Sequence, residues 1–420
     1  MTNIIDELKA RGLIKDFSNE DEVRELLNSK QTIYCGFDPS AASMHVGNFV
    51  MISMLMRLQR AGHKIVAIVC GATGMIGDPS GKSKERNLQS KEALEENTLK
   101  IKAQLERFID LSNPEKGVIL NNYDWISKLS VLDYLRDYGK YFPVNYMLNK
   151  DIVSSRLQSG VSYTEFSYMI LQSIDFLTLY RNEGVRIQIG GGDQWGNITS
   201  GLELIRKIEG IDTKVGCFTV PLLLDQNGKK FGKSEDGALY LDAKLVSPYK
   251  IYQYFINVSD DDAARYLKVF SFKSLAEIEQ ISKDHYANLG ARIAQKALAY
   301  EIVSLIHGED KAAECKKMSE VLFSGEIKSL SQDAIEELFG SFKVAQPEGL
   351  LLEDLLIAIK AASSKREARE FINGNSISIN GEKCTDLTKV VTKKDSLFDK
   401  YVVIKRGKKN YYLVDFTNAK

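Results

Sequence analysis

The sequence lacks several features that would restrict where the protein works. No apolar run approaches the roughly 18–20 residues that cross a bilayer, and residues 1–17 form a charged amphipathic helix pattern without the apolar centre of a signal peptide. The five cysteines stand singly, with no CxxC pair, which argues against a disulfide framework and a structural zinc site. No low-complexity run interrupts the 420 residues. We therefore expect a cytoplasmic protein of two or three domains, with no membrane partner.

The net charge is zero, but the charges are unevenly distributed. Residues 351–420 contain 14 Lys and Arg against 9 Asp and Glu, a net charge of +5, so the preceding residues carry −5. A basic C-terminal segment on an acidic body is typical of a module that binds a polyanion, although a solubilising surface would have the same composition.

Strand and helix patterns alternate in the first half of the chain. Short β-branched runs predict strands at 32–37, 64–69 and 185–189, and apolar periodicity predicts helices at about 46–60 and 195–208. This alternation is typical of βαβ units in a parallel, doubly wound sheet, which binds ligands beyond the carboxyl ends of its strands.

The rest of the chain is predominantly helical until the last residues. We expect mainly helix at about 85–180 and throughout 248–320, followed by a weakly periodic linker around 322–348. From Leu351 a helix begins again, and three short strand patterns close the chain, at 376–380, 401–405 and 411–414.

A first polar motif follows the strand at 32–37. It contains Asp38 and Ser40, and then His45, Gly47 and Asn48 at the start of a helix. The free N–H groups and the dipole of a helix N-terminus favour an anion, and a glycine there lets a nucleotide approach the backbone. Taken alone, the histidine would more often be an ordinary capping residue.

A second motif follows a predicted strand at 219–224 and a turn at 225–228. It reads Lys229-Lys230-Phe231-Gly232-Lys233-Ser234. Lysines on a glycine-containing loop stabilise the charge that develops on a leaving pyrophosphate. A solvated basic loop is the alternative.

Together, in this order and context, the two motifs resemble the HIGH and KMSKS signatures of class I aminoacyl-tRNA synthetases. The departures are Asn48 for the last histidine, and Phe231-Gly232 for Met-Ser. Both variants are similar to those of bacterial tyrosyl-tRNA synthetases, and a neutral Asn48 still hydrogen-bonds a ribose oxygen.

A third set lies on the helix predicted from Tyr163. Tyr168, Gln172 and Asp175 have the i, i+4, i+7 spacing that puts them on one helical face. Polar groups among apolar neighbours need a partner if they are buried, and a bound amino acid provides one. The resemblance implies that Tyr168 and Gln172 bind its α-amino group, and that Asp175 with Tyr34 binds a phenolic hydroxyl. The alternative is a solvent-facing polar stripe.

Two glycine-containing turns complete the candidate site. Residues 190–197 connect a strand to a helix, and by resemblance Gly191 and Asp193 hold the ribose while Gln194 lies near the substrate carbonyl. Residues 74–86 are not a P-loop, because Ile76 stands where that motif needs glycine. The resemblance assigns Asp78 to the substrate ammonium, and Lys82 and Arg86 to pyrophosphate.

The basic C-terminal segment resembles an S4 RNA-binding domain. Lys365, Arg366 and Arg369 fall at the start of a helix that ends near Gly374. Such a basic edge reads folded RNA through its phosphates, and we expect these three residues to contact tRNA.

The resemblance covers essentially the whole chain and implies its domains and its chemistry. The expected fold is a Rossmann-like catalytic domain with a helical insertion (1–224), a KFGKS loop region (225–247), an α-helical domain (248–320), a linker (321–348) and an S4 domain (349–420). The implied ATP contacts are Gly36, Asp38, His45, Gly47, Asn48, Gly191, Asp193, Phe231 and Lys233. The implied catalytic groups are Ser40, His45, Lys82, Arg86, Lys230, Lys233 and Ser234.

The expected reaction is tyrosine activation by Mg²⁺-ATP and transfer of the tyrosyl group to tRNA, in a homodimer formed through residues near 130–170. No tightly bound cofactor or metal is expected. One alternative is a class I synthetase for tryptophan, against which the Tyr34 and Asp175 pair argues. A second is a non-catalytic RNA-binding protein descended from a synthetase.

Overall fold

A computed structural model describes residues 3–80, 89–154, 157, 160–224, 228, 231–234, 237–407 and 410–416. The chain divides into two compact units that are interleaved in sequence. The first unit contains residues 1–245 and 261–284, and the second contains residues 246–260 and 285–420. In the described part of the chain no helix combines the length and apolarity needed to cross a membrane.

The first unit is built on a five-stranded parallel sheet with the strand order β3-β2-β1-β4-β5. Its strands are β1 (Thr32–Phe37), β2 (Lys64–Val69), β3 (Gly117–Asn121), β4 (Val185–Gly191) and β5 (Gly216–Val220). The strands are short, β-branched and buried, as expected of a sheet covered on both faces. The predicted doubly wound parallel sheet is therefore confirmed.

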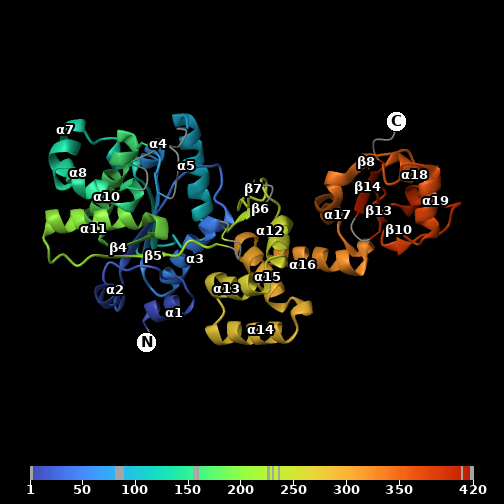
Figure 1. The fold of residues 1–420 in the computed structure, drawn as a ribbon, viewed down its shortest axis with the longest axis horizontal. Coiled ribbons are helices and arrows are strands. Elements are labelled where there is room, and N and C mark those ends of the chain that lie inside the picture. Colours follow the sequence, from blue (N-terminus) through green and yellow to red (C-terminus); the bar gives the residue numbers. More distant parts are fainter. Residues whose placement is uncertain are drawn as a thin grey trace. The chain divides into compact units, whose positions relative to one another are not determined.

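Helices cover this sheet. Those before the third strand are α1 (Ile4–Ala10), α2 (Glu20–Leu27), α3 (Val46–Arg60), α4 (Thr73–Ile76) and α5 (Lys91–Leu105). Helix α10 (Tyr163–Glu183) packs along α11 (Trp195–Glu209), and both lie against β4 (Figure 1). Gly184 ends α10 with φ of 67°, a left-handed cap that favours glycine.

In this unit one strand was not predicted and another was misplaced. The stretch at 85–180 contains β3 as well as helices, because the apolar run there is short and is followed at once by Asn121 and Asn122. The strand predicted at 219–224 is instead β5, which ends at Val220 because Pro221 has no N–H for the sheet.

The insertion between β3 and α10 consists of short helices. They are α6 (Tyr123–Ile126), α7 (Val131–Asp133), α8 (Val144–Leu148) and α9 (Asp151–Ser154). Several large apolar side chains of this insertion are exposed, among them Val131, Leu132 and Val144.

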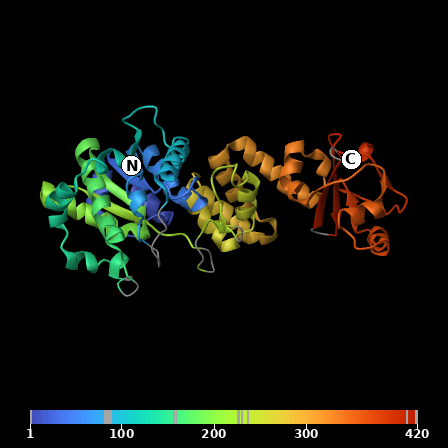
Figure 2. The ribbon, with the colours of Figure 1, turned by 90° about the horizontal axis from the view of Figure 1, so that it is seen from above.

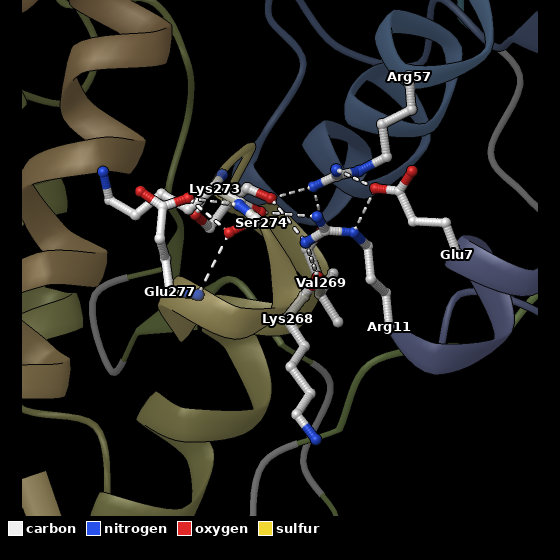
Figure 3. Close-up of polar contacts among 9 residues, drawn as sticks. Glu7, Arg11, Arg57, Lys268, Val269, Lys273, Ser274 and Glu277 are labelled. Carbon is white, nitrogen blue, oxygen red and sulfur yellow. Dashed lines mark hydrogen bonds and ion pairs between the residues drawn. The ribbon is translucent and has the colours of Figure 1, made fainter. Parts of the chain in front are cut away.

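Residues 261–284 belong to the first unit although they follow part of the second. They include most of α13 (Asp260–Phe270) and of α14 (Leu275–Ala287). Figure 3 shows the guanidinium groups of Arg11 and Arg57 facing the end of α13, where Arg11 donates to the carbonyls of Lys268, Ser271 and Lys273 at 3.2, 3.0 and 2.7 Å. Buried guanidiniums thus satisfy the carbonyls that a helix end leaves unpaired. Residues 248–320, expected as one helical domain, are consequently divided between the units.

The second unit begins with three packed helices, α12 (Pro248–Ile256), α15 (Ile293–His307) and α16 (Glu309–Ser324). A five-stranded sheet follows with the order β11-β10-β13-β14-β8. It lies in the red, C-terminal part of the ribbon (Figure 1 and Figure 2). Its strands are β8 (Lys343–Ala345), β10 (Ile377–Ile379), β11 (Glu382–Lys383), β13 (Tyr401–Arg406) and β14 (Asn410–Asp415). Helices α18 (Leu352–Ala358) and α19 (Lys365–Asn373) pack on it, and β9 (Leu350–Leu351) pairs with β12 (Val390–Val391).

The predicted linker at 321–348 is part of this second unit. It forms α17 (Gln332–Phe339) and β8, which pairs in parallel with β14. Ile335 and Phe339 are buried in one cluster with Tyr401 and Leu413. The prediction failed because partners for these apolar residues come from strands about 60 residues further along the chain.

Candidate active site

A cavity of about 430 Å³ opens at the carboxyl ends of the strands of the first sheet. It gathers fifteen of the predicted site residues: Tyr34, Gly36, Asp38, Ser40, His45, Gly47, Asn48, Asp78, Tyr168, Gln172, Asp175, Gly191, Asp193, Gln194 and Phe231. Lys82, Arg86 and Lys230 lie outside the described residues. Lys233 and Ser234 form the short strand β6 (Lys233–Ser234), which pairs with β7 (Gly237–Ala238).

The first motif is a reciprocal cap on α3. The backbone N–H of Asn48 donates to His45 Nδ1 at 3.3 Å, and the backbone N–H of His45 donates to Asn48 Oδ1 at 3.0 Å. This arrangement fixes His45 at the helix N-terminus and explains why an amide at position 48 serves the local structure. A Cβ at Gly47 would lie 2.7 Å from the His45 ring, so glycine is required there.

The second motif lies directly against the first. Val46 N–H donates to the Leu239 carbonyl at 2.9 Å, and His45 forms a bridge with Tyr240. Gly232 has φ of 79°, and a Cβ on it would lie 2.9 Å from the backbone nitrogen of Gly47. The glycine of the KFGKS sequence is therefore needed both for its backbone conformation and for this close approach.

Asp175 lies at the base of the cavity and is held by two donors. Trp125 Nε1 donates to Oδ1 at 2.7 Å, and Asn122 Nδ2 donates to Oδ2 at 3.0 Å. The side chain is 3% exposed. Burial raises the pKa of Asp175 to about 7, although the hydrogen bonds from Asn122 and Trp125 oppose the shift. Its remaining lone pairs can accept a further donor from a ligand.

The Tyr34 hydroxyl is buried beside this carboxylate without a hydrogen-bond partner among the described residues. Its ring packs against Phe176 with the ring centroids 5.5 Å apart. Burial, and secondarily the charge of Asp175, raise the pKa of Tyr34 well above its ordinary value, so the phenol stays neutral. An unpaired buried hydroxyl is costly, and a ligand hydroxyl would satisfy it.

Three further polar side chains line the walls. The Tyr168 hydroxyl donates to Asp38 Oδ1 at 3.5 Å. Gln172 Oε1 and Gln188 Oε1 are buried without a partner in the described part of the chain. Gln188 was missed from the sequence, because a single glutamine in the β-branched run of β4 gives no pattern of its own.

Asp78 also lines the cavity and is the centre of a hydrogen-bonded cluster. Gln194 Nε2 donates to Oδ2 at 2.5 Å, while the N–H of Ser80 and Asn197 Nδ2 donate to Oδ1 at 3.0 and 3.3 Å. The carboxylate is 6% exposed. It thus presents a fixed negative charge at the cavity, suited to an ammonium group.

Gly191 and Asp193 lie where β4 passes into α11. Gly191 ends β4, and Asp193 belongs to a single 3₁₀ turn, Gly192–Gln194. A Cβ on Gly191 would lie 2.6 Å from Asp193 Oδ1, so this glycine leaves room for the carboxylate at the cavity mouth.

The predicted basic edge lies in the second unit, on α19. Arg369 Nε and Nη2 donate to the Glu353 carboxylate at 2.5 and 3.1 Å, and Lys365 pairs with Asp354 at 2.7 Å. The hydrogen bonds of Arg369 lower the pKa of the buried Glu353. Arg366 pairs with Glu370 at 3.2 Å, but its side chain is 90% exposed.

Comparisons with known proteins identify the family of the chain. The family described as "tRNA synthetases class I (W and Y)" matches residues 26–324. The chain belongs to this family. The "Tyrosine--tRNA ligase SYY-like C-terminal domain" matches residues 334–414.

Individual relatives cover nearly the whole chain. It is 48% identical to "Tyrosine--tRNA ligase 1" of Bacillus licheniformis and 47% identical to "Tyrosine--tRNA ligase" of Geobacillus stearothermophilus, in each case over 99% of this chain and 100% of the relative. A C-terminally truncated mitochondrial tyrosyl-tRNA synthetase of Aspergillus nidulans has a similar structure, with a TM-score of 0.70 and 30% identity over 77% of this chain and 95% of that one. The class I synthetase fold is therefore confirmed.

Proposed function

We propose that the chain is a tyrosine–tRNA ligase. The tyrosine carboxylate attacks the α-phosphate of ATP and forms tyrosyl-adenylate and pyrophosphate, and a terminal ribose hydroxyl of tRNA then attacks the adenylate. The observation that carries the proposal is a buried pair that lines the cavity: the Tyr34 hydroxyl, which has no hydrogen-bond partner among the described residues, and the Asp175 carboxylate. Its support is the family membership and the full-length relatives.

In this proposal the substrate phenol donates to Asp175 and accepts from Tyr34. The ammonium group of tyrosine binds Asp78, with Tyr168 and Gln172 beside it, and Gln194 orients the carboxylate that attacks. Phenylalanine would leave the buried Tyr34 hydroxyl unsatisfied, and it would offer no further donor to Asp175, which would keep only its bonds from Trp125 and Asn122. Tyrosyl-tRNA synthetases are themselves the established example of such discrimination. A tryptophan side chain offers no hydroxyl at that depth.

ATP binds across the two signature motifs, at the helix N-terminus that attracts its phosphates. The groups proposed to contact the nucleotide are Gly36, Asp38, His45, Gly47, Asn48, Gly191, Asp193, Phe231 and Lys233. Ser40, His45, Lys82, Arg86, Lys230, Lys233 and Ser234 are proposed to stabilise the charge on the transferring phosphate and on pyrophosphate. ATP would enter as its Mg²⁺ complex, with the ion as part of the substrate.

The second unit would bind tRNA, with Lys365, Arg366 and Arg369 on its basic edge. A homodimer is proposed through the insertion, where Val131, Leu132 and Val144 are 73, 77 and 61% exposed. Large apolar side chains gathered on one exposed segment are typical of a protein interface.

The test is ATP–pyrophosphate exchange with each of the twenty amino acids in turn, followed by tRNA charging with the amino acid that is active. Tyrosine alone should support exchange. Exchange with tryptophan would replace the substrate assignment, and no exchange with any amino acid would favour a non-catalytic RNA-binding role.

A further inference from the structure

Helix α13 holds the chain on both sides of the segment that joins β5 to β6. Before this segment, Arg265 Nη2 and the Tyr266 hydroxyl both donate to the carbonyl oxygen of Leu224, the latter at 3.3 Å. Arg265 is also paired with Asp262 at 2.5 Å, which fixes its guanidinium on the surface of the helix. One turn of α13 therefore fixes the end of the chain that leaves the sheet.

The same helix receives the chain where the second motif begins. The Phe231 ring packs edge-on against Tyr266, with the ring centroids 4.7 Å apart, and against Phe270 at 5.4 Å. Phe231 N–H donates to the Leu223 carbonyl at 3.0 Å, which joins the two sides at their base. Tyr266 thus contacts both sides, through its hydroxyl and through its ring.

Helix α13 is itself fixed to the helix that carries the first motif. Arg57, near the end of α3, donates to the carbonyl oxygens of Val269, at 3.2 Å, and of Ser271 (Figure 3). Phe49 of α3 stacks on Phe270 with the ring planes 14° apart. The position of Gly232 against Gly47 is consequently set through a continuous path from α3 to α13 to Phe231.

We propose that Arg265 is a positioning residue for ATP use: by holding Leu224 against α13 it fixes Phe231 and Gly232 beside the first motif. The inference rests on the proposed function. Arg265 does not line the cavity, and neither do the other residues of α13. Its loss should therefore affect the ATP step and spare tyrosine binding, whose proposed groups lie on β1, on α10, after α4 and in the turn after β4.

The experiment compares Arg265→Met with Arg265→Lys in the full chain. The methionine variant keeps the stem of the side chain and removes its donors, whereas lysine keeps one. Since a hydrogen bond from a charged donor is lost at a half-exposed site, adenylate formation in single turnover should slow about three- to tenfold in Arg265→Met. Arg265→Lys should recover part of this rate, and the dissociation constant of tyrosine should change less than about twofold.

Lys268→Met is the matched control. It removes a positive charge from the same helix one turn away, at a side chain that points away from the other side chains labelled in Figure 3. It should leave the rate unchanged. Tyr266→Phe removes the second donor to Leu224, together with the hydroxyl that accepts from Arg265 Nη2 at 3.3 Å, and provides a second test of the Leu224 contact if Arg265→Met folds poorly.

Two results would overturn the inference: an unchanged rate in both Arg265→Met and Tyr266→Phe, or a loss of tyrosine affinity equal to the loss of rate. An equal effect of Lys268→Met would also overturn it, because helix charge and not the Leu224 contact would then be responsible. The wild-type chain is the reference. Its failure to activate tyrosine would count against the proposed function, whereas the variants bear on Arg265.

Discussion

The cavity of the first unit and the α19 edge of the second unit present polar side chains in opposite circumstances. In the cavity, Tyr34, Gln172 and Gln188 are buried with oxygen atoms that have no partner in the described chain. On α19, Lys365 and Arg369 are half exposed and already paired with Asp354 and Glu353. A ligand can therefore provide the missing hydrogen-bond partners in the cavity, whereas Lys365 and Arg369 on α19 already form ion pairs within the chain.

Residue type alone does not predict a binding site, because burial decides whether a polar side chain needs a partner. A buried polar group without a partner costs free energy, so its presence points to a ligand. An exposed cation costs little whether or not it binds anything, and a neighbouring acid can neutralise it. The proposal that the cavity binds a ligand therefore depends on burial as well as charge. The proposal that α19 binds RNA depends chiefly on Arg366, whose side chain is the most exposed of the three.

We expect the largest effect from a truncation that keeps the cavity and removes the α19 edge. A fragment that ends at Glu320 retains every described cavity residue and loses the second sheet. It should still form tyrosyl-adenylate, while tRNA charging at physiological salt falls on the order of 10³-fold because phosphate contacts are lost. Pyrophosphate exchange and aminoacylation measured on one preparation check this. Charging at the full rate would mean that the C-terminal sheet serves another partner.

Within the cavity, the charged member of the pair should matter more than the neutral one. Asp175→Ala should lower kcat/KM for tyrosine about 100-fold, since a charged acceptor is lost, whereas Tyr34→Phe should lower the preference for tyrosine over phenylalanine about tenfold or less. Tyr34→Phe should not lower the thermal midpoint of the ligand-free protein, because the Tyr34 hydroxyl bonds to no group in the part of the chain that the structure describes. An unchanged tyrosine to phenylalanine ratio in Tyr34→Phe would refute the pocket assignment.

His45 combines a structural cap with a proposed catalytic role, and two variants separate them. His45→Ala should slow adenylate formation on the order of 100-fold and also destabilise α3 by about 1 kcal/mol. His45→Asn should slow the reaction similarly but retain the cap, because asparagine is a good capping residue. Rapid-quench kinetics and thermal unfolding on both variants provide the measurement. Tyrosine affinity that fell in parallel would place His45 in the amino-acid pocket.

On α19 we expect substitution of Arg366 to weaken tRNA binding and substitution of Arg369 to lower stability. Arg366→Gln should raise KM for tRNA about two- to fivefold and reduce the slope of log affinity against log salt by about 1, without loss of stability. Arg369→Gln should lower the unfolding midpoint, since Glu353 would remain buried without its bidentate partner. Equal effects of the two variants on tRNA affinity and none on stability would show that the Glu353 pair opens when RNA binds.

The smallest effect is a dependence on pH. Because the pKa of Asp175 is raised to about 7 in the folded chain, this group stabilises the fold below the unfolded pKa of about 3.9, and that contribution is lost as pH rises through about 7. Tyrosine affinity should change in the opposite sense and weaken as pH falls below about 7. Asp175→Asn should remove both dependences, as measured by unfolding and by ligand titration. A wild-type affinity that stays constant from pH 6 to pH 8 would contradict the ionised carboxylate as acceptor.

The residues of the cavity could largely be predicted because their neighbours in sequence carry the signal. Tyr168, Gln172 and Asp175 share one face of a helix, and His45 and Asn48 cap another. Asn122 and Trp125, which hold Asp175, were not found, since they follow a strand that reads as part of a helical region. Their role depends on side-chain contacts with α10, about 50 residues further along the chain, that no local pattern encodes.

The secondary structure could also be predicted where the signal is local. The prediction failed where the contacting residues lie far apart in the sequence. Strands with apolar runs were found, whereas the segment at 332–345 reads as a linker because its partner strands lie far along the chain. The division of residues 248–320 between two units depends on Arg11 and Arg57, whose hydrogen bonds go to carbonyl groups more than 200 residues away. Every residue has a backbone carbonyl group, so the sequence does not show which of them accept these hydrogen bonds.

The interleaving of the two units has a consequence for synthesis on the ribosome. All five strands of the first sheet have been made once Val220 has emerged, but α13, which fixes Leu224 and Phe231, is complete only at Phe270. Between these points the nascent chain has a finished sheet and an unsupported second motif. The residues of α12, which join the later unit, emerge in the same interval and must wait for α15. Co-translational folding should thus yield tyrosine binding before it yields ATP use, in the order in which the ribosome releases the chain.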